Sequence, residues 1–136
     1  MKEPRIDFDD EGISFDGDLI TYDEIPFTGV IYELNEAGQI VYEGNYLRGF
    51  TNGKVQFFYN DGRLESEHNA KRGLADGESR EYYQNGNLMT LSISENGVCL
   101  ERYSWDEDGT LVKHEYFESN RERVKYYKDL YEKWIE

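Results

Sequence analysis

The chain has 136 residues, and its 29 acidic and 15 basic side chains give a formal net charge of −14. This charge repels nucleic acids and anionic lipid headgroups, so neither is an expected partner, whereas a basic protein would be attracted. Hydrophobic residues make up 38% of the chain. That content is too high for a disordered protein, and the length fits one domain over residues 1–136.

The first 28 residues carry half of the excess charge, because nine acidic and two basic side chains leave a net charge of −7. Apolar residues such as Ile6, Phe8 and Ile13 alternate there with acidic residues, a pattern typical of short β-strands. We therefore expect degenerate, acidic leading strands over residues 5–28. No apolar stretch of the kind found in secretion signals opens the chain, so the expected location is cytoplasmic.

One segment of this acidic head has the spacing of a calcium-binding loop. From Asp7 to Asp18, acidic residues occur at alternating positions, with Gly12 at the sixth position and an acid at the twelfth. Glu11 at the fifth position, the short Asp18 at the twelfth and the strand-like flanks all depart from that loop. We interpret the segment as an acidic turn between strands and expect no metal or cofactor.

Glycines recur every 24 residues through the middle of the chain, which indicates a repeat array. Each unit holds two apolar stretches and two turns, and sequences such as Asn60-Asp61-Gly62 are typical of tight hairpins. This spacing predicts an antiparallel repeat sheet over residues 29–117. The glycines expected at its structural turns are Gly29, Gly38, Gly53, Gly62, Gly77, Gly86 and Gly109.

Aromatic side chains should form rows across this sheet, because equivalent residues of successive units lie side by side. Neighbouring pairs such as Phe58-Tyr59 and Tyr82-Tyr83 must point to opposite faces. One helix cannot cover both faces, so one aromatic row should be partly exposed and available to a partner.

The last part of the chain has helical periodicity. Val124, Tyr127, Tyr131 and Trp134 fall on one side at spacings of three and four residues, and Ser119 stands three residues before Glu122 as in a capping box. We expect an amphipathic helix over residues 119–135 that packs on the sheet or closes its end.

The pattern Gly-x₅-Tyr-x-x-Gly-x-Leu, found from Gly53 to Leu64 and from Gly77 to Leu88, resembles the variant MORN repeat, the membrane occupation and recognition nexus motif. The segment 26–29, Pro-Phe-Thr-Gly, is similar to the opening of the array in bacterial antitoxin-type members. The resemblance implies a mainly β fold, an antiparallel β-meander of 24-residue units, with the C-terminal helix as its cap. It also implies an antitoxin or immunity protein that neutralises a toxin, with a protein-docking scaffold as the alternative.

Catalytic chemistry finds little support in the sequence. The two histidines, His68 and His114, stand in non-adjacent units, and a meander does not favour bringing them together. The sequence contains no nucleophile elbow, phosphate-binding loop or Cys/His cluster. We expect the protein not to be an enzyme.

The predicted partner is a cognate, basic protein toxin such as a nuclease, whose active site an acidic patch could fill. When free, the protein is expected to be a monomer or a weak homo-oligomer. The side chains predicted to bind the partner are acids of the head and of the turns, together with two tyrosines as anchors: Asp7, Asp9, Asp10, Glu11, Tyr59, Asp61, Tyr83, Asp106, Glu107 and Asp108.

Overall fold

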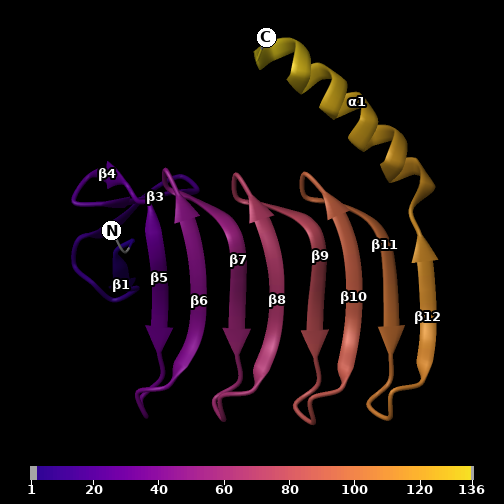
Figure 1. Cartoon of the computed structure of the whole chain (residues 1–136), viewed down its shortest axis with the longest axis horizontal. Coiled ribbons are helices and arrows are strands. Elements are labelled where there is room, and N and C mark those ends of the chain that lie inside the picture. Colours follow the sequence, from indigo (N-terminus) through magenta and orange to yellow (C-terminus); the bar gives the residue numbers. More distant parts are fainter. Residues whose placement is uncertain (1–2, 136) are drawn as a thin grey trace.

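The computed structural model describes the backbone of residues 3–135 and the side chains of residues 3–126 and 129. Most of the chain forms one nine-stranded sheet, followed by a single helix (Figure 1). In spatial order, the strands of this sheet are β1 (Arg5–Asp7), β5 (Gly29–Leu34), β6 (Ile40–Leu47), β7 (Phe50–Phe58), β8 (Leu64–Lys71), β9 (Leu74–Tyr82), β10 (Leu88–Glu95), β11 (Val98–Trp105) and β12 (Leu111–Tyr116).

From β5 to β12 every strand pairs antiparallel with the next strand in the sequence. The prediction of a mainly β fold, an antiparallel meander ending in a helix, is therefore confirmed. The pairing also brings equivalent residues together as the period requires: Leu34 lies opposite Ile40, Phe58 opposite Leu64, Tyr82 opposite Leu88 and Trp105 opposite Leu111.

The acidic head forms strands, as expected, but they do not simply begin the meander. Strand β1 pairs parallel with β5. The next three strands, β2 (Ile13–Asp16), β3 (Leu19–Tyr22) and β4 (Ile25–Pro26), make a separate antiparallel sheet. The physical reason is burial: head and large sheet enclose the main hydrophobic core, which consists of Ile6, Ile20, Phe27, Ile31 and Tyr46.

The register gives the large sheet two distinct faces. One carries Ile31, Val55, His68 and Ser79 side by side and is called the His68 face below. The core residues Ile31 and Tyr46 belong to this face, so the head covers its N-terminal end. The opposite face, called the Tyr103 face, carries Tyr32, Glu67, Tyr103 and His114 among its cross-strand partners.

Hairpins at residues 47–50, 71–74 and 95–98 form the upper edge of the sheet in Figure 1. Arg48 and Gly49 both have positive φ, 50° and 92°, as a two-residue hairpin turn of the primed type requires. Each turn glycine donates a backbone hydrogen bond to the preceding unit: Gly49 to Phe27 O (2.8 Å), Gly73 to Thr51 O (2.9 Å) and Gly97 to Ala75 O (2.7 Å).

The predicted turn glycines occupy two kinds of position. Gly38, Gly62, Gly86 and Gly109 lie in the opposite set of hairpin turns, as expected. Gly53 and Gly77 instead lie inside β7 and β9, where the pairing register shifts, and they have φ of 96° and 95°. The prediction that these two glycines lie in turns was wrong. Both lie at irregularities inside strands, where the backbone needs a positive φ. Gly29, with φ of 147°, is the first residue of β5 and pairs with Tyr46, so its assignment to a turn was also wrong.

Helix α1 (Glu118–Ile135) follows β12, and its first turns lie where the next upper-edge hairpin of the repeat would stand. The amide nitrogen Nδ2 of Asn120 donates to Cys99 O at 3.0 Å, and Cys99 stands 24 residues after Ala75 in the series of carbonyl acceptors described above. Val124 of α1 and Leu100 of β11 are both buried, 5% exposed, where the helix packs against β11. The prediction that the helix closes the end of the sheet thus holds for its first two turns.

The start of the helix differs from the prediction. The helix begins at Glu118, so Ser119 lies within its first turn instead of preceding it, and the carbonyl of Phe117 accepts bonds from the amides of Asn120 and Arg121. The predicted apolar side chains at 127, 130, 131, 134 and 135 lie outside the described side chains. Among the described residues, no helix is long and apolar enough to cross a membrane.

Candidate functional site

Four hairpin turns line up along the edge of the sheet opposite the upper edge (Figure 1), and they comprise residues 35–39, 59–63, 83–87 and 106–110. This set of turns is called the lower edge. It holds Tyr59, Asp61, Tyr83 and the acids of 106–108, so the structure brings six of the predicted partner-binding residues to one edge. These turns contain five acidic side chains and one basic side chain, Arg63, for a net charge of −4.

Side chains tie neighbouring turns of the lower edge together. The hydroxyl of Tyr59 donates to Tyr82 O at 2.6 Å, and the hydroxyl of Tyr83 donates to Trp105 O at 2.8 Å. Between the last two turns, Asn85 Nδ2 and Asn87 Nδ2 both donate to Glu107 O, at 3.0 and 2.8 Å. The two tyrosines therefore help to hold adjacent units in place, a structural role that their identical position in the repeat could have indicated.

The turn carboxylates are partly used within their own turns. Oδ1 of Asp61 accepts the backbone amide of Arg63 at 3.0 Å. Oδ1 of Asp106 accepts the amides of Asp108 and Thr110, both at 3.0 Å. These bonds fix the orientation of each carboxylate, and the second oxygen of Asp61 lies 3.8 Å from Arg63 Nε.

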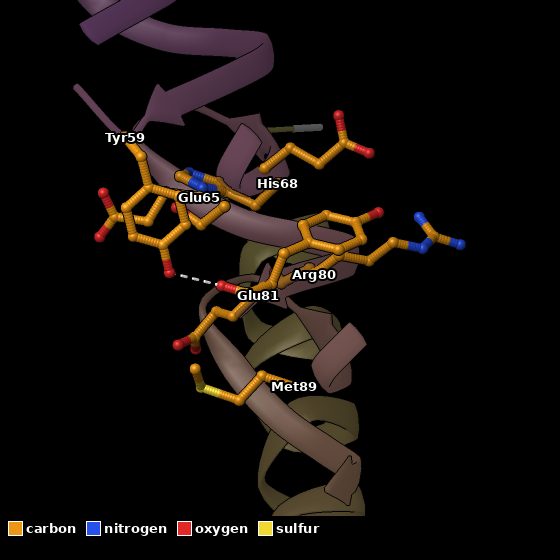
Figure 2. Close-up of a pocket in the computed structure, with 10 residues that line it drawn as sticks. Tyr59, Glu65, His68, Arg80, Glu81 and Met89 are labelled. Atoms are coloured by element: carbon orange, nitrogen blue, oxygen red, sulfur yellow. Dashed lines mark hydrogen bonds between the residues drawn. The ribbon is translucent and has the colours of Figure 1, made fainter. Parts of the chain in front are cut away.

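A hollow of about 240 Å³ opens beside the lower edge, where β7 ends and β8 runs next to β9. Its walls include Tyr59, Glu65, His68, Glu81 and Met89 (Figure 2). Strand register places His68 and Ser79 directly opposite each other, and Glu81 opposite Ser66, so these four lining residues share the His68 face. The hollow could not be predicted from the sequence, because it depends on which residues of β8 and β9 pair.

The hollow is electrostatically negative. Partial burial, followed by the charges of Glu65, Glu81 and Asp61, raises the pKa of the Tyr59 hydroxyl above its usual value. Burial lowers the pKa of His68, which is therefore neutral at pH 7. Arg80 also lines the hollow, but its side chain extends away from Tyr59 in Figure 2 and forms an ion pair with Glu78. The hollow suits a cationic group more than an anionic one.

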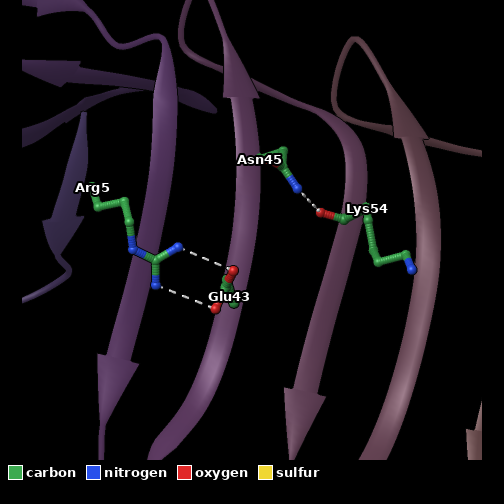
Figure 3. A network of polar contacts seen from close by, with 4 residues as sticks. All are labelled: Arg5, Glu43, Asn45 and Lys54. Atoms are coloured by element: carbon green, nitrogen blue, oxygen red, sulfur yellow. Dashed lines mark hydrogen bonds and ion pairs between the residues drawn. The ribbon is translucent and has the colours of Figure 1, made fainter. Parts of the chain in front are cut away.

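At the N-terminal end, the Tyr103 face is more nearly neutral. Arg5 binds both carboxylate oxygens of Glu43, at 3.2 and 3.4 Å, and this hydrogen bonding raises the pKa of Arg5 (Figure 3). Next to this pair, Asn45 Nδ2 donates to Lys54 O at 2.8 Å. These contacts join β1, β6 and β7 and leave little unbalanced charge there.

The acids of the head lie far from those of the last turn. Strands β1 and β12 are the two edge strands of the sheet, and eight spacings of ~4.8 Å separate them by roughly 38 Å. Oδ1 of Asp7 accepts the amide of Asp9, and Oδ1 of Asp10 accepts the amide of Gly12. Over the described residues, no three His, Cys, Asp or Glu side chains are grouped closely enough to hold a metal ion. The acidic head therefore holds Asp7, Asp9, Asp10 and Glu11. These four residues do not form one patch with the acids of the lower edge.

A third cluster lies on the Tyr103 face at the C-terminal end. Oε1 of Glu101 accepts a hydrogen bond from the Tyr103 hydroxyl at 2.8 Å and lies 2.7 Å from His114 Nε2. The rings of Tyr103 and His114 stack with centroids 3.9 Å apart. The hydrogen bonds from His114 and Tyr103 lower the pKa of Glu101. His68 lies on the other face and four strands away, so the two histidines do not share a site.

Comparison with known families matches the MORN repeat variant at residues 51–72 and 75–97. These segments contain β7 with β8 and β9 with β10, the two units that frame the hollow. Comparison with the curated proteins finds no match. The chain therefore carries MORN-variant repeats over residues 51–97, and the hydrogen bonds that repeat at 24-residue intervals extend the same geometry to the flanking strands.

Proposed function

We propose that this protein is a non-enzymatic docking protein whose acidic hollow and lower edge bind a basic protein partner. MORN repeats are generally consistent with protein docking, and the repeats found here surround the proposed site. The observation that carries the proposal is the hollow itself, a recess lined by Glu65 and Glu81 next to the predicted anchor Tyr59.

The size and charge of the hollow suit one long basic side chain. A volume of about 240 Å³ can hold the stem and head of a lysine or an arginine. A guanidinium or ammonium group there would meet the carboxylates of Glu65 and Glu81, and its stem would lie against Met89 and the Tyr59 ring.

The lower edge would provide the remaining contacts. Asp61, Asp106, Glu107 and Asp108 project from turns that the inter-turn hydrogen bonds hold in place. A surface that is already ordered loses little conformational entropy on binding. Its net charge of −4 would speed the encounter with a basic surface and make binding sensitive to salt.

The finer proposal is that the partner is a toxin of the same locus and that the protein is its cytoplasmic antitoxin or immunity protein. A toxin that cleaves nucleic acid has a basic active site, which these carboxylates could occupy in place of phosphates. The repeat and the acidic site are equally compatible with a scaffold that binds several basic proteins. A single gene-adjacent partner would support the antitoxin, and several unrelated partners would support the scaffold.

The test is a titration of the purified protein with the candidate toxin encoded next to it, followed by calorimetry at several salt concentrations. We expect binding that weakens as salt rises. Glu65→Gln together with Glu81→Gln should weaken it about tenfold or more. The matched control is Asp16→Asn with Asp18→Asn, which removes the same charge from the exposed head.

Each possible outcome bears on a different part of the proposal. Equal losses in the two double variants would show that only overall charge matters and would contradict the hollow as a site. Binding that does not respond to salt would contradict the electrostatic basis. Tight binding to unrelated basic proteins but not to the candidate toxin would replace the antitoxin with the scaffold.

A further inference from the structure

The outer edge of β12 is the most open backbone edge of the sheet. Strand order ends at β12, and Leu111, Val112 and Tyr116 are 50%, 62% and 58% exposed. Proteins usually block such an edge with charges, proline or a very short strand, as the three-residue β1 does at the other end. Helix α1 runs upward and away from this edge in Figure 1, so the described part of the chain leaves it accessible.

The hydrogen bonding of β12 determines which of its backbone groups face outward. The amide of Phe117 donates to Leu100 O at 2.9 Å, so residue 117 bonds toward β11. Because alternate residues of an antiparallel strand bond to the same side, Glu115 and Lys113 also bond inward. The N–H and C=O groups of His114 and Tyr116 therefore face outward, whereas Val112 lies at the register shift between the Ser104–Lys113 and Trp105–Leu111 pairs.

We propose that β12 pairs antiparallel with β12 of a second copy of this chain, with His114 at the two-fold axis. In this register the outward groups of the two His114 residues meet each other across the axis. The two nine-stranded sheets then continue as one.

Charge complementarity selects both the occupant and the register. With His114 at the axis, each Lys113 lies opposite Glu115 of the other copy, which gives two ion pairs across the interface. The only charges within β12 besides the histidine are these two, and in each copy they already lie on one face, 3.5 Å apart. The sequence of the strand is thus complementary to itself.

Neighbouring registers are less favourable. A shift of two residues in one direction places Lys113 opposite Lys113, and the opposite shift places Glu115 opposite Glu115, so each juxtaposes like charges. A shift by one residue would oppose outward groups to inward ones. Of these registers, only the one centred on His114 satisfies both the backbone and the charges.

The Glu101–Tyr103–His114 cluster prepares the strand for pairing. Its hydrogen bonds, 2.7 and 2.8 Å long, and the stacked rings hold the side chain of His114 toward β11 and keep it from covering the edge. An interface of one six-residue strand is small, so the dimer should be weak and should appear only at high protein concentration. The inference does not depend on the proposed docking function, which uses a different part of the sheet.

The test measures molecular mass by sedimentation up to sub-millimolar concentration. We expect the wild type to shift from the 16.1 kDa monomer toward the dimer as concentration rises. Lys113→Glu alone and Glu115→Lys alone should each remain monomeric, because like charges then face each other. An equimolar mixture of the two variants should recover a dimer, since every pair across a mixed interface is again of opposite charge.

Hydrogen exchange of individual amides gives an independent readout that does not rely on variants. The amide of His114 should gain protection as concentration rises, while those of Lys113 and Glu115 should not change. A wild type that stays monomeric throughout, or a mixture as monomeric as its components, would overturn the proposal. Protection that rises on some other element instead would also overturn it.

Discussion

The two ends of the large sheet are stabilised in different ways. At the N-terminal end, the head encloses Ile6, Ile20, Phe27, Ile31 and Tyr46 in a two-layered core. From β8 onward the sheet is a single layer except where α1 packs against β11, and both of its faces carry many polar side chains. Such a layer depends on strand pairing and on contacts between successive units more than on a core, as expected of a repeat array.

The largest effect should come from the core of the N-terminal end. Ile31 is 0% exposed, so Ile31→Ala should lower the free energy of unfolding by about 3–4 kcal/mol, from lost burial and a cavity. Leu91→Ala, at a half-buried position of the single layer, should cost about 1 kcal/mol. Urea denaturation of both variants measures the difference, and equal losses would show that the two ends do not differ.

Two turn glycines test the same difference between the region covered by the head and the single layer. Gly49 has φ of +92°, and a Cβ there would meet the Leu19 side chain and Ile20 O, the latter at 2.9 Å. Gly49→Ala should therefore cost about 2–4 kcal/mol, from backbone strain and displacement of the head. Gly62 has nearly the same φ of +90° but open space around it, so Gly62→Ala should cost only the strain, about 1 kcal/mol. Thermal denaturation compares them, and a Gly62→Ala loss as large as that of Gly49→Ala would contradict the role of the head.

Alkaline pH should weaken the packing around Tyr42 at the N-terminal end. Burial, followed by the 2.5 Å hydrogen bond with Tyr46, raises the pKa of Tyr42 above its usual value of 10.0. The unfolded chain then ionises this phenol first, so its contribution to stability is complete below about pH 10 and decreases above that pH.

Tyr42→Phe tests this. It should cost about 1 kcal/mol at neutral pH, because it leaves the Tyr46 hydroxyl without this partner, and it should flatten the decline of stability above about pH 10. Denaturation curves recorded from neutral to alkaline pH measure both effects. Tyr83→Phe is the control, since it removes a hydroxyl from the single layer instead of the core. An unchanged alkaline slope in Tyr42→Phe would contradict the assignment.

The smallest expected effect concerns the junction of α1 with the sheet. Asn120→Ala removes the hydrogen bond to Cys99 O and should cost about 1 kcal/mol. Amide hydrogen exchange should rise in the first turns of α1 and remain unchanged in β5 and β6. Asn60→Ala, in an exposed turn, provides the control. If both variants leave exchange in α1 unaltered, Asn120 does not hold the helix.

The sequence predicted those parts of the fold that local chemistry determines. Turns such as Asn60-Asp61-Gly62 specify their own hairpins, and their regular spacing specifies a meander. The parallel pairing of β1 with β5 could not be predicted in this way, because Arg5 and Val30 are distant in the sequence and no turn joins them directly. The prediction that the head forms short strands was therefore correct, but the sequence did not show that these strands form a second layer.

The candidate site was only partly predictable for the same reason. The acids of the lower edge belong to turns, and the period alone placed them in one row. The hollow depends on the pairing of His68 with Ser79 next to a register shift, and the Glu101–His114 pair depends on the β11–β12 register. Such irregularities follow from the packing of several strands together, which no single segment encodes.

The contact between Asn120 and Cys99 O has a consequence for how such proteins can change in length. The carbonyls of Phe27, Thr51, Ala75 and Cys99 present the same acceptor once per unit, and the first three meet a glycine amide while the last meets the helix. A duplication or deletion of 24 residues would present the same acceptor to α1 again. The array can thus gain or lose a module by recombination, while the head and the helix keep their attachment points unaltered.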